Sequence, residues 1–140
     1  MITSEGLDLA LNVLLGATTK PSFYVGFVSA TSFTGFSSSD TMSSHTGWTE
    51  YTDYAESTRQ QVNFGASSSG EITNPVSADI TPNAATDLAG FFITTNSAKS
   101  GTTGVLFATS AFDQGTRSVQ AGVTEQFTLN CSAVNSSSSS

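Results

Sequence analysis

Two apolar runs decide the fold of this chain, SFYVGFVSA at residues 22–30 and LAGFFITT at residues 88–95. Both runs are rich in aromatic and β-branched residues, which favour strands. The first run stays apolar through its middle instead of alternating with polar residues, as expected of a strand covered on both faces. We therefore expect both runs to form strands of one β-structured domain, with the second as a central strand.

Shorter segments on either side of these runs predict further strands, with a long Ser-, Thr- and Gly-rich surface loop at residues 31–44 and a hairpin tip at 67–70. Pro75 places the start of its segment at a sheet edge or bulge. In the last segment we expect one shared face for Val123, Phe127, Leu129 and Cys131, with Cys131 as a small buried hydrophobe. The expected segments are 48–54 (a short strand or an aromatic turn), 58–66, 71–82, 104–112, 117–121 and 123–133.

The first segment predicts the one helix of the chain, at about residues 4–16. Thr3 or Ser4 can cap its start, Glu5 and Asp8 lie near that positive end, and Gly16 can close it. A helix this short must dock on something to be stable. Its apolar face can dock on its own sheet or on a neighbouring subunit, and the residues of that face are Leu7, Leu11, Leu14 and Leu15.

These elements define a mostly β fold class: an antiparallel β-sandwich or jelly-roll-like domain with one short N-terminal helix. We assign residues 1–134 to this single domain and expect a disordered Ser tail at 135–140. No signal peptide fits the acidic start, and no apolar run approaches a membrane span, so we expect a soluble protein made without an export signal.

The composition points away from chemistry and from nucleic acid. The chain has one His, one Cys and four Lys or Arg against eleven Asp or Glu, a net charge of −7, and about a third of its residues are Ser or Thr. Nucleic-acid partners require clustered basic residues. A zinc or calcium site requires ligand spacings that this sequence lacks. We expect no catalytic residue, no metal and no cofactor.

The segment DTMSSHTGW at residues 40–48 is the densest cluster of functional side chains. A hydrolase interpretation would use Ser43 or Ser44 as nucleophile and His45 as base, but adjacent residues rarely face each other, and the chain has no Gly-x-Ser-x-Gly motif. The alternative is a structural brace, in which Asp40 caps one helical turn, Gly47 provides a sharp exit, and His45 and Trp48 pin the loop to the body.

Three aromatic residues, Trp48, Tyr51 and Tyr54, allow a second alternative for this region. If their rings were exposed, they could form a platform for sugars or for a protein partner. In a chain with a single Trp, however, burial of that ring in the core is the more common arrangement.

Two segments carry a resemblance to a known family. The run from Asp40 to Glu50, continued by Tyr54, Glu56, Thr58 and Arg59, resembles small tailed-phage virion proteins described as capsid decoration, or cement, proteins. The run KSGTTGVLF at 99–107 and the opening amphipathic helix fit the same pattern. That family commonly has Pro where this chain has Thr46 and Gln60.

The resemblance implies a non-enzymatic structural role on the exterior of a phage capsid, with synthesis in the host cytoplasm. The expected partners are the major capsid protein and two further copies in a homotrimer, without nucleic acid or membrane. Alternatives are a tail, baseplate or fibre component, and a carbohydrate-binding module that uses Trp48 and Tyr51. The residues expected at the interface are Leu7, Leu11, Phe33 and Phe36.

Overall fold

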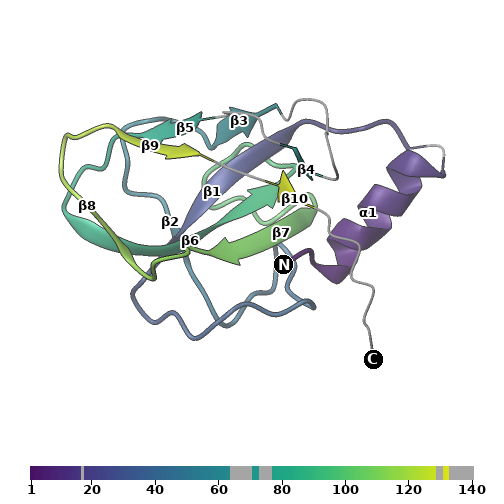
Figure 1. Ribbon diagram of the computed structural model, residues 1–140, viewed down its shortest axis with the longest axis horizontal. Coiled ribbons are helices and arrows are strands. Elements are labelled where there is room, and N and C mark those ends of the chain that lie inside the picture. The colour runs from purple at the N-terminus through teal and green to yellow at the C-terminus, as the bar shows by residue number, and fades with distance from the viewer. Residues whose placement is uncertain (17, 64–70, 73–76, 129–130, 133–140) are drawn as a thin grey trace.

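The computed structural model describes residues 1–16, 18–63, 71–72, 77–128 and 131–132, which form a mostly β fold with antiparallel sheets and one helix (Figure 1). This confirms the predicted fold class at that level. The elements are α1 (Ser4–Leu14), β1 (Phe23–Ser29), β2 (Glu50–Tyr51), β3 (Gln60–Val62), β4 (Glu71–Ile72), β5 (Ser77–Ile80), β6 (Thr86–Thr94), β7 (Leu106–Ala111), β8 (Arg117–Val119), β9 (Glu125–Thr128) and β10 (Cys131–Ser132).

The two apolar runs pair with each other at the centre of a six-stranded sheet. In this sheet β1 pairs with β6. The other edge of β1 pairs with β2 and β3. The other edge of β6 pairs with β7 and β8. Every pairing is antiparallel. The central position predicted for the second run is therefore confirmed.

The middle of β1 is buried on both faces, as its unbroken apolar pattern predicts. Val25 and Phe27 point to one face of the sheet and Val28 to the other. Gly26 lies opposite Phe92 of β6. A Cβ atom at Gly26 would overlap the Phe92 ring, so glycine makes room for an aromatic side chain there.

The first core lies between the large sheet and the paired strands β5 and β9, which Figure 1 shows along one side of that sheet. The ring centroids of Phe27 and Phe127 are 4.5 Å apart across this layer. Ala78 and Ile80 of β5 are fully buried beside them. The layering is sandwich-like, and the jelly-roll part of the fold stays a prediction.

The opposite face of the large sheet is covered by the loop that follows β1. Met42 and Trp48 of this loop are buried against Phe92 and Leu106 and form the second core. In Figure 1 the loop runs along the side of the sheet away from β5 and β9. Residues 31–44 form a loop, as predicted, and most of them are exposed. Asp40 and Met42 are buried, so the second half of this loop also acts as a lid over the sheet.

The helix α1 docks on β7 through its first turn. Thr3 is the N-cap, since its side chain accepts a hydrogen bond from the Gly6 amide. The carboxylate of Glu5 accepts a hydrogen bond of 2.6 Å from the Leu106 amide. The C-cap is Leu15 and not Gly16, because the Leu15 amide bonds back to Leu11 and Asn12.

Gly6 sits against the backbone of β7, where an added Cβ would overlap the carbonyl oxygen of Phe107. Gly6→Ala would usually help a helix, but here it must displace α1 from the sheet. We expect it to lower the free energy of unfolding by about 1–3 kcal/mol. The matched control is Asn12→Ala at an exposed position of α1, which should change it by less than about 0.5 kcal/mol. Chemical denaturation followed by circular dichroism measures both, and equal effects of the two variants would contradict this account of α1 docking.

The remaining strand predictions have mixed outcomes. Strands form in all six expected segments, and the segments at 71–82 and 123–133 each contain two. Val123 is 51% exposed and precedes β9, so the inward face predicted for it with Phe127 is wrong. Pro75, Leu129, the hairpin tip at 67–70, the Ser tail and the burial of Cys131 lie outside the residues and side chains that the structure describes.

Candidate functional site

Trp48 is the centre of the predicted brace. Its side chain is 3% exposed, and its indole Nε1 donates a hydrogen bond of 3.0 Å to Oδ2 of Asp40. The His45 ring stacks on the indole with centroids 3.8 Å apart and an interplanar angle of 14°. Nδ1 of His45 donates to the Trp48 carbonyl oxygen at 2.9 Å. Three of the four brace residues are thus in direct contact.

Asp40 and Gly47 serve this loop in ways the sequence analysis did not anticipate. Asp40 follows a turn rather than capping a helical turn, and its Oδ2 also accepts a hydrogen bond of 2.8 Å from the Ser37 amide. Gly47 accepts a hydrogen bond of 2.8 Å from the Thr34 amide. A Cβ at Gly47 would overlap the Gly35 carbonyl oxygen. Close approach of two backbone segments therefore explains this glycine.

The geometry at His45 does not form a hydrolase site. The ring nitrogen Nδ1 is engaged by the Trp48 carbonyl, and the Ser43 hydroxyl lies 3.3 Å from that of Thr41. Among the described residues, no hydrogen bond joins His45 to Ser43 or Ser44. The side chains in this segment hold the lid in place.

The three aromatic residues Trp48, Tyr51 and Tyr54 are all buried, so the exposed platform that a sugar would need is not present at these positions. Burial, followed by the nearby Glu50 carboxylate, raises the pKa of the Tyr54 phenol well above its ordinary value. Burial and Asp53 raise the pKa of Tyr51 in the same direction. Both phenols therefore remain protonated near neutral pH, unlike a catalytic base.

Arg59 forms a buried ion pair that the sequence analysis missed. Its Nε and Nη2 atoms donate to the two carboxylate oxygens of Glu50 at 2.9 and 2.7 Å. The side chains are 0% and 9% exposed. The guanidinium also donates to the carbonyl oxygens of Asn96 and Gly101, and it lies 5.1 Å from the centroid of the Phe92 ring.

A second cation, Lys99, also links residues 50–59 to residues 96–101. Its Nζ donates to the carbonyl oxygens of Thr52 and Tyr54 at 3.1 and 2.9 Å and lies 4.0 Å from the Tyr54 ring centroid. The Ser100 amide donates to Glu50. The two segments on which the family resemblance rests, 40–59 and 99–107, are therefore neighbours in space.

Glu56 joins the same region to residue 81. Its carboxylate accepts hydrogen bonds from the Thr81 amide at 2.8 Å and from the Thr81 hydroxyl at 3.2 Å. Burial opposes ionisation of this carboxyl, but these hydrogen bonds and the Lys99 charge leave its pKa below the ordinary value. The ionised Glu56 carboxylate therefore adds to the free energy of unfolding at pH values above the ordinary pKa of a glutamate. This contribution is lost as the pH falls through the lowered pKa of Glu56 in the folded protein.

The residues predicted at an interface fall into two groups. Leu7 and Leu11 are exposed, together with Leu14 and Leu15, and these four leucines are between 51 and 78% exposed. We call them the leucine face of α1. Phe33 and Phe36 are instead half-buried, since they pack on the second core and on each other, with centroids 5.0 Å apart.

Neither a metal centre nor a membrane-spanning helix is found in the described part of the chain. There, no group of three or more His, Cys, Asp or Glu residues could hold a metal ion, and no helix is long and apolar enough to cross a bilayer.

The chain matches no protein-family model, and comparisons with curated proteins and with solved structures found no match.

Proposed function

We propose that this chain is a non-enzymatic structural protein of a virion, which binds the outer surface of an assembled phage capsid and stabilises it. The observation that carries the proposal is the leucine face of α1, whose four side chains are exposed. Figure 1 shows α1 at one end of the molecule. Contiguous exposed apolar residues mark interaction surfaces. The resemblance of residues 40–59 and 99–107 to decoration proteins supplies the class of partner.

The proposed contact surface includes the neighbouring loop. The Ser4 amide at the start of α1 donates a hydrogen bond of 2.7 Å to the Ser38 carbonyl oxygen. This bond links α1 to the loop that carries the half-buried Phe33 and Phe36. Because the contact is apolar and the chain has few cations, attachment should depend only weakly on salt.

Binding of this kind stabilises a shell by mass action, because the protein binds the intact shell and not its separated subunits. Complete burial of one leucine contributes about 1.5–3 kcal/mol, so four leucines supply a useful gross free energy at each copy. A homotrimer on the local three-fold axes of the shell would multiply that contribution.

A tail, baseplate or fibre position is the alternative to a position on the shell. The number of copies per particle separates the two, because hundreds of copies indicate the shell.

The proposal predicts the effect of removing the leucine face. Leu11→Ser combined with Leu14→Ser should weaken binding of the protein to shells of the major capsid protein by about 100-fold, since two apolar anchors are lost. The matched control is Val123→Ser, which changes a similarly exposed apolar residue outside α1. It should bind as the unmodified protein does. Co-sedimentation with shells measures the binding of the unmodified protein, the double leucine variant and the control, after circular dichroism has shown that each variant is folded.

A heating experiment tests the role itself. Particles that carry the protein should retain their DNA to a higher temperature than particles that lack it. If both release DNA at the same temperature and image reconstruction shows no density for the protein on the shell, the capsid proposal fails and the tail alternative takes its place.

A further inference from the structure

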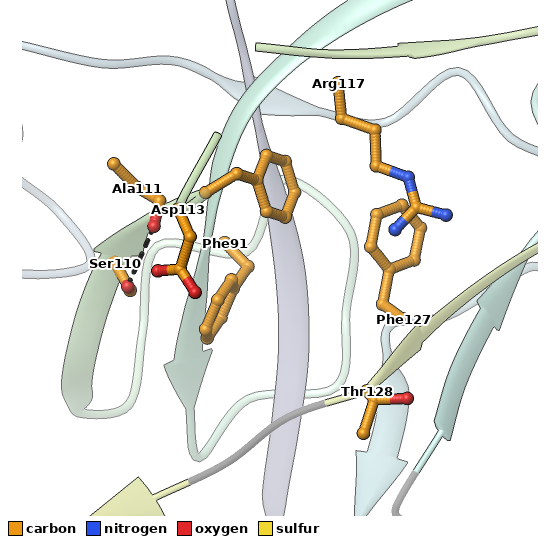
Figure 2. Close-up of a pocket in the computed structure, with 8 residues that line it drawn as sticks. Phe91, Ser110, Ala111, Asp113, Arg117, Phe127 and Thr128 are labelled. Carbon is orange, nitrogen blue, oxygen red and sulfur yellow. Dashed lines mark hydrogen bonds between the residues drawn. The ribbon is translucent and has the colours of Figure 1, made fainter. Parts of the chain in front are cut away.

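A cleft of about 200 Å³ lies between the end of β7, the turn that follows it, and β9 (Figure 2). Its apolar lining consists of Ala111 and three phenylalanine side chains, of which Phe91 and Phe112 are half-buried and Phe127 is buried. Phe112 and Phe127 are stacked with centroids 5.7 Å apart, and Phe91 lies 6.1 Å from Phe112. The turn lines an adjoining hollow of about 370 Å³ that shares Phe112, Asp113 and Arg117 with the cleft. The cleft is distinct from the buried aromatic residues of the brace.

Arg117 supplies fixed hydrogen-bond donors to this cleft. Its Nη2 donates to Oε2 of Glu125 at 2.9 Å, and its guanidinium lies 4.2 Å from the Phe127 ring centroid. Figure 2 shows the guanidinium over that ring. Among the described residues, no hydrogen bond uses Nε or Nη1 of Arg117. These donors are held in place and remain available to a ligand.

Asp113 supplies the matching acceptor. It is exposed on the turn after β7, and no described residue donates a hydrogen bond to its carboxylate. Figure 2 shows Asp113 and Arg117 on different sides of the cleft. The hydroxyls of Ser110 and Thr128 also line the cleft. The polar groups around the phenyl rings therefore include both donors and acceptors.

This combination selects a neutral polyol rather than an ion. An anion would meet Asp113 and an Arg117 already paired with Glu125, while a cation would meet the Arg117 guanidinium. A sugar has an apolar C–H face that can lie on the half-buried Phe91 and Phe112 rings, and its hydroxyls both donate and accept. A cavity of 150 Å³ holds benzene, so about 200 Å³ accommodates one six-membered ring with substituents. We propose that this cleft binds one pyranose unit of a carbohydrate, with Asp113 and Arg117 bonding its hydroxyls.

The test is a titration of the ¹⁵N-labelled protein with methyl glucoside, methyl galactoside, methyl mannoside and N-acetylglucosamine, followed by amide chemical shifts. At least one sugar should cause saturable shifts of the amides of residues 113–117 and Phe127, with α1 unchanged. The affinity should not change with salt, because the ligand is neutral. Asp113→Asn should weaken it about tenfold, since a charge-assisted acceptor is lost. The matched control Asp79→Asn, at an exposed position of β5, should leave it unchanged.

Two outcomes would overturn the proposal. One is the absence of saturable shifts with all four sugars, or shifts that are equally strong in Asp113→Asn. The other comes from n-butylammonium, used as a probe for a basic side chain. If this cation shifts the same amides with an affinity that falls as salt rises, while the sugars do not, the cleft accepts a basic group of a protein partner instead.

Discussion

Replacing Arg59 by methionine is expected to lower the free energy of unfolding by about 3–5 kcal/mol, because Glu50 is left as a buried carboxylate without its cation. The Asn96 and Gly101 carbonyl oxygens would lose their donor as well. Urea denaturation followed by far-UV circular dichroism measures the loss. Arg59 belongs neither to the leucine face nor to the lining of the cleft, so the effect belongs to folding alone.

The exposed pair Arg117–Glu125 provides the matched control. Its side chains are 39% and 20% exposed, against 0% and 9% for Arg59 and Glu50. Arg117→Met should therefore cost less than about 1 kcal/mol. Adding Glu50→Gln to Arg59→Met removes the stranded charge, so the double variant should be more stable than the sum of the single effects by about 1–3 kcal/mol. Strict additivity would show that the two groups are not coupled.

Replacing Trp48 by alanine is expected to lower the free energy of unfolding by about 3–5 kcal/mol, because a large ring is removed from a packed core. The indole lies between His45 on one side and Phe92 on another, with centroids 3.8 and 5.0 Å away. Its loss would also free the lid from the large sheet. Since Trp48 is the single tryptophan, far-UV circular dichroism must replace fluorescence as the measurement.

Trp48→Phe separates the ring from its hydrogen bond. The phenyl ring keeps most of the packing, while Asp40 loses the indole donor, so the expected loss is about 1–3 kcal/mol. A loss below about 1 kcal/mol for Trp48→Ala would contradict the burial of this side chain and revive an exposed aromatic platform.

The sheet centre was predictable because local pattern and burial agree there. The run at 22–30 is apolar without interruption, and β1 is covered on both faces. The spacing of Leu7, Leu11 and Leu14 identifies the helix, but these leucines are exposed, so the spacing does not predict how α1 docks. The lid could not be predicted, because residues 31–44 look like a polar loop and only Met42 and the later Trp48 anchor it. Burial of such a segment depends on contacts that are distant in sequence.

The same limit applies to the candidate sites. Asp40, His45 and Trp48 lie within nine residues, so their association could be predicted from the sequence. Arg59 and Lys99 stand alone among polar residues, and nothing local distinguishes them from solvated surface cations. Apart from Glu50, their partners come from segments about forty residues away, such as Gly101 for Arg59. The phenylalanine cleft escaped prediction for the same reason, since its three rings come from β6, from the turn after β7 and from β9.

The attachment of the first residues to β7 has a consequence for the behaviour of the protein in concentrated solution. β7 is an outer strand of the large sheet, but Ile2 pairs with Ala108, and the amides of Thr3 and Thr109 complete a short ladder there. An outer strand with unpaired amides invites a strand from another chain. At residues 107–109 that place is already taken by the protein's own N-terminal segment. A strand of a second copy therefore cannot pair with this stretch of β7 when molecules lie close together.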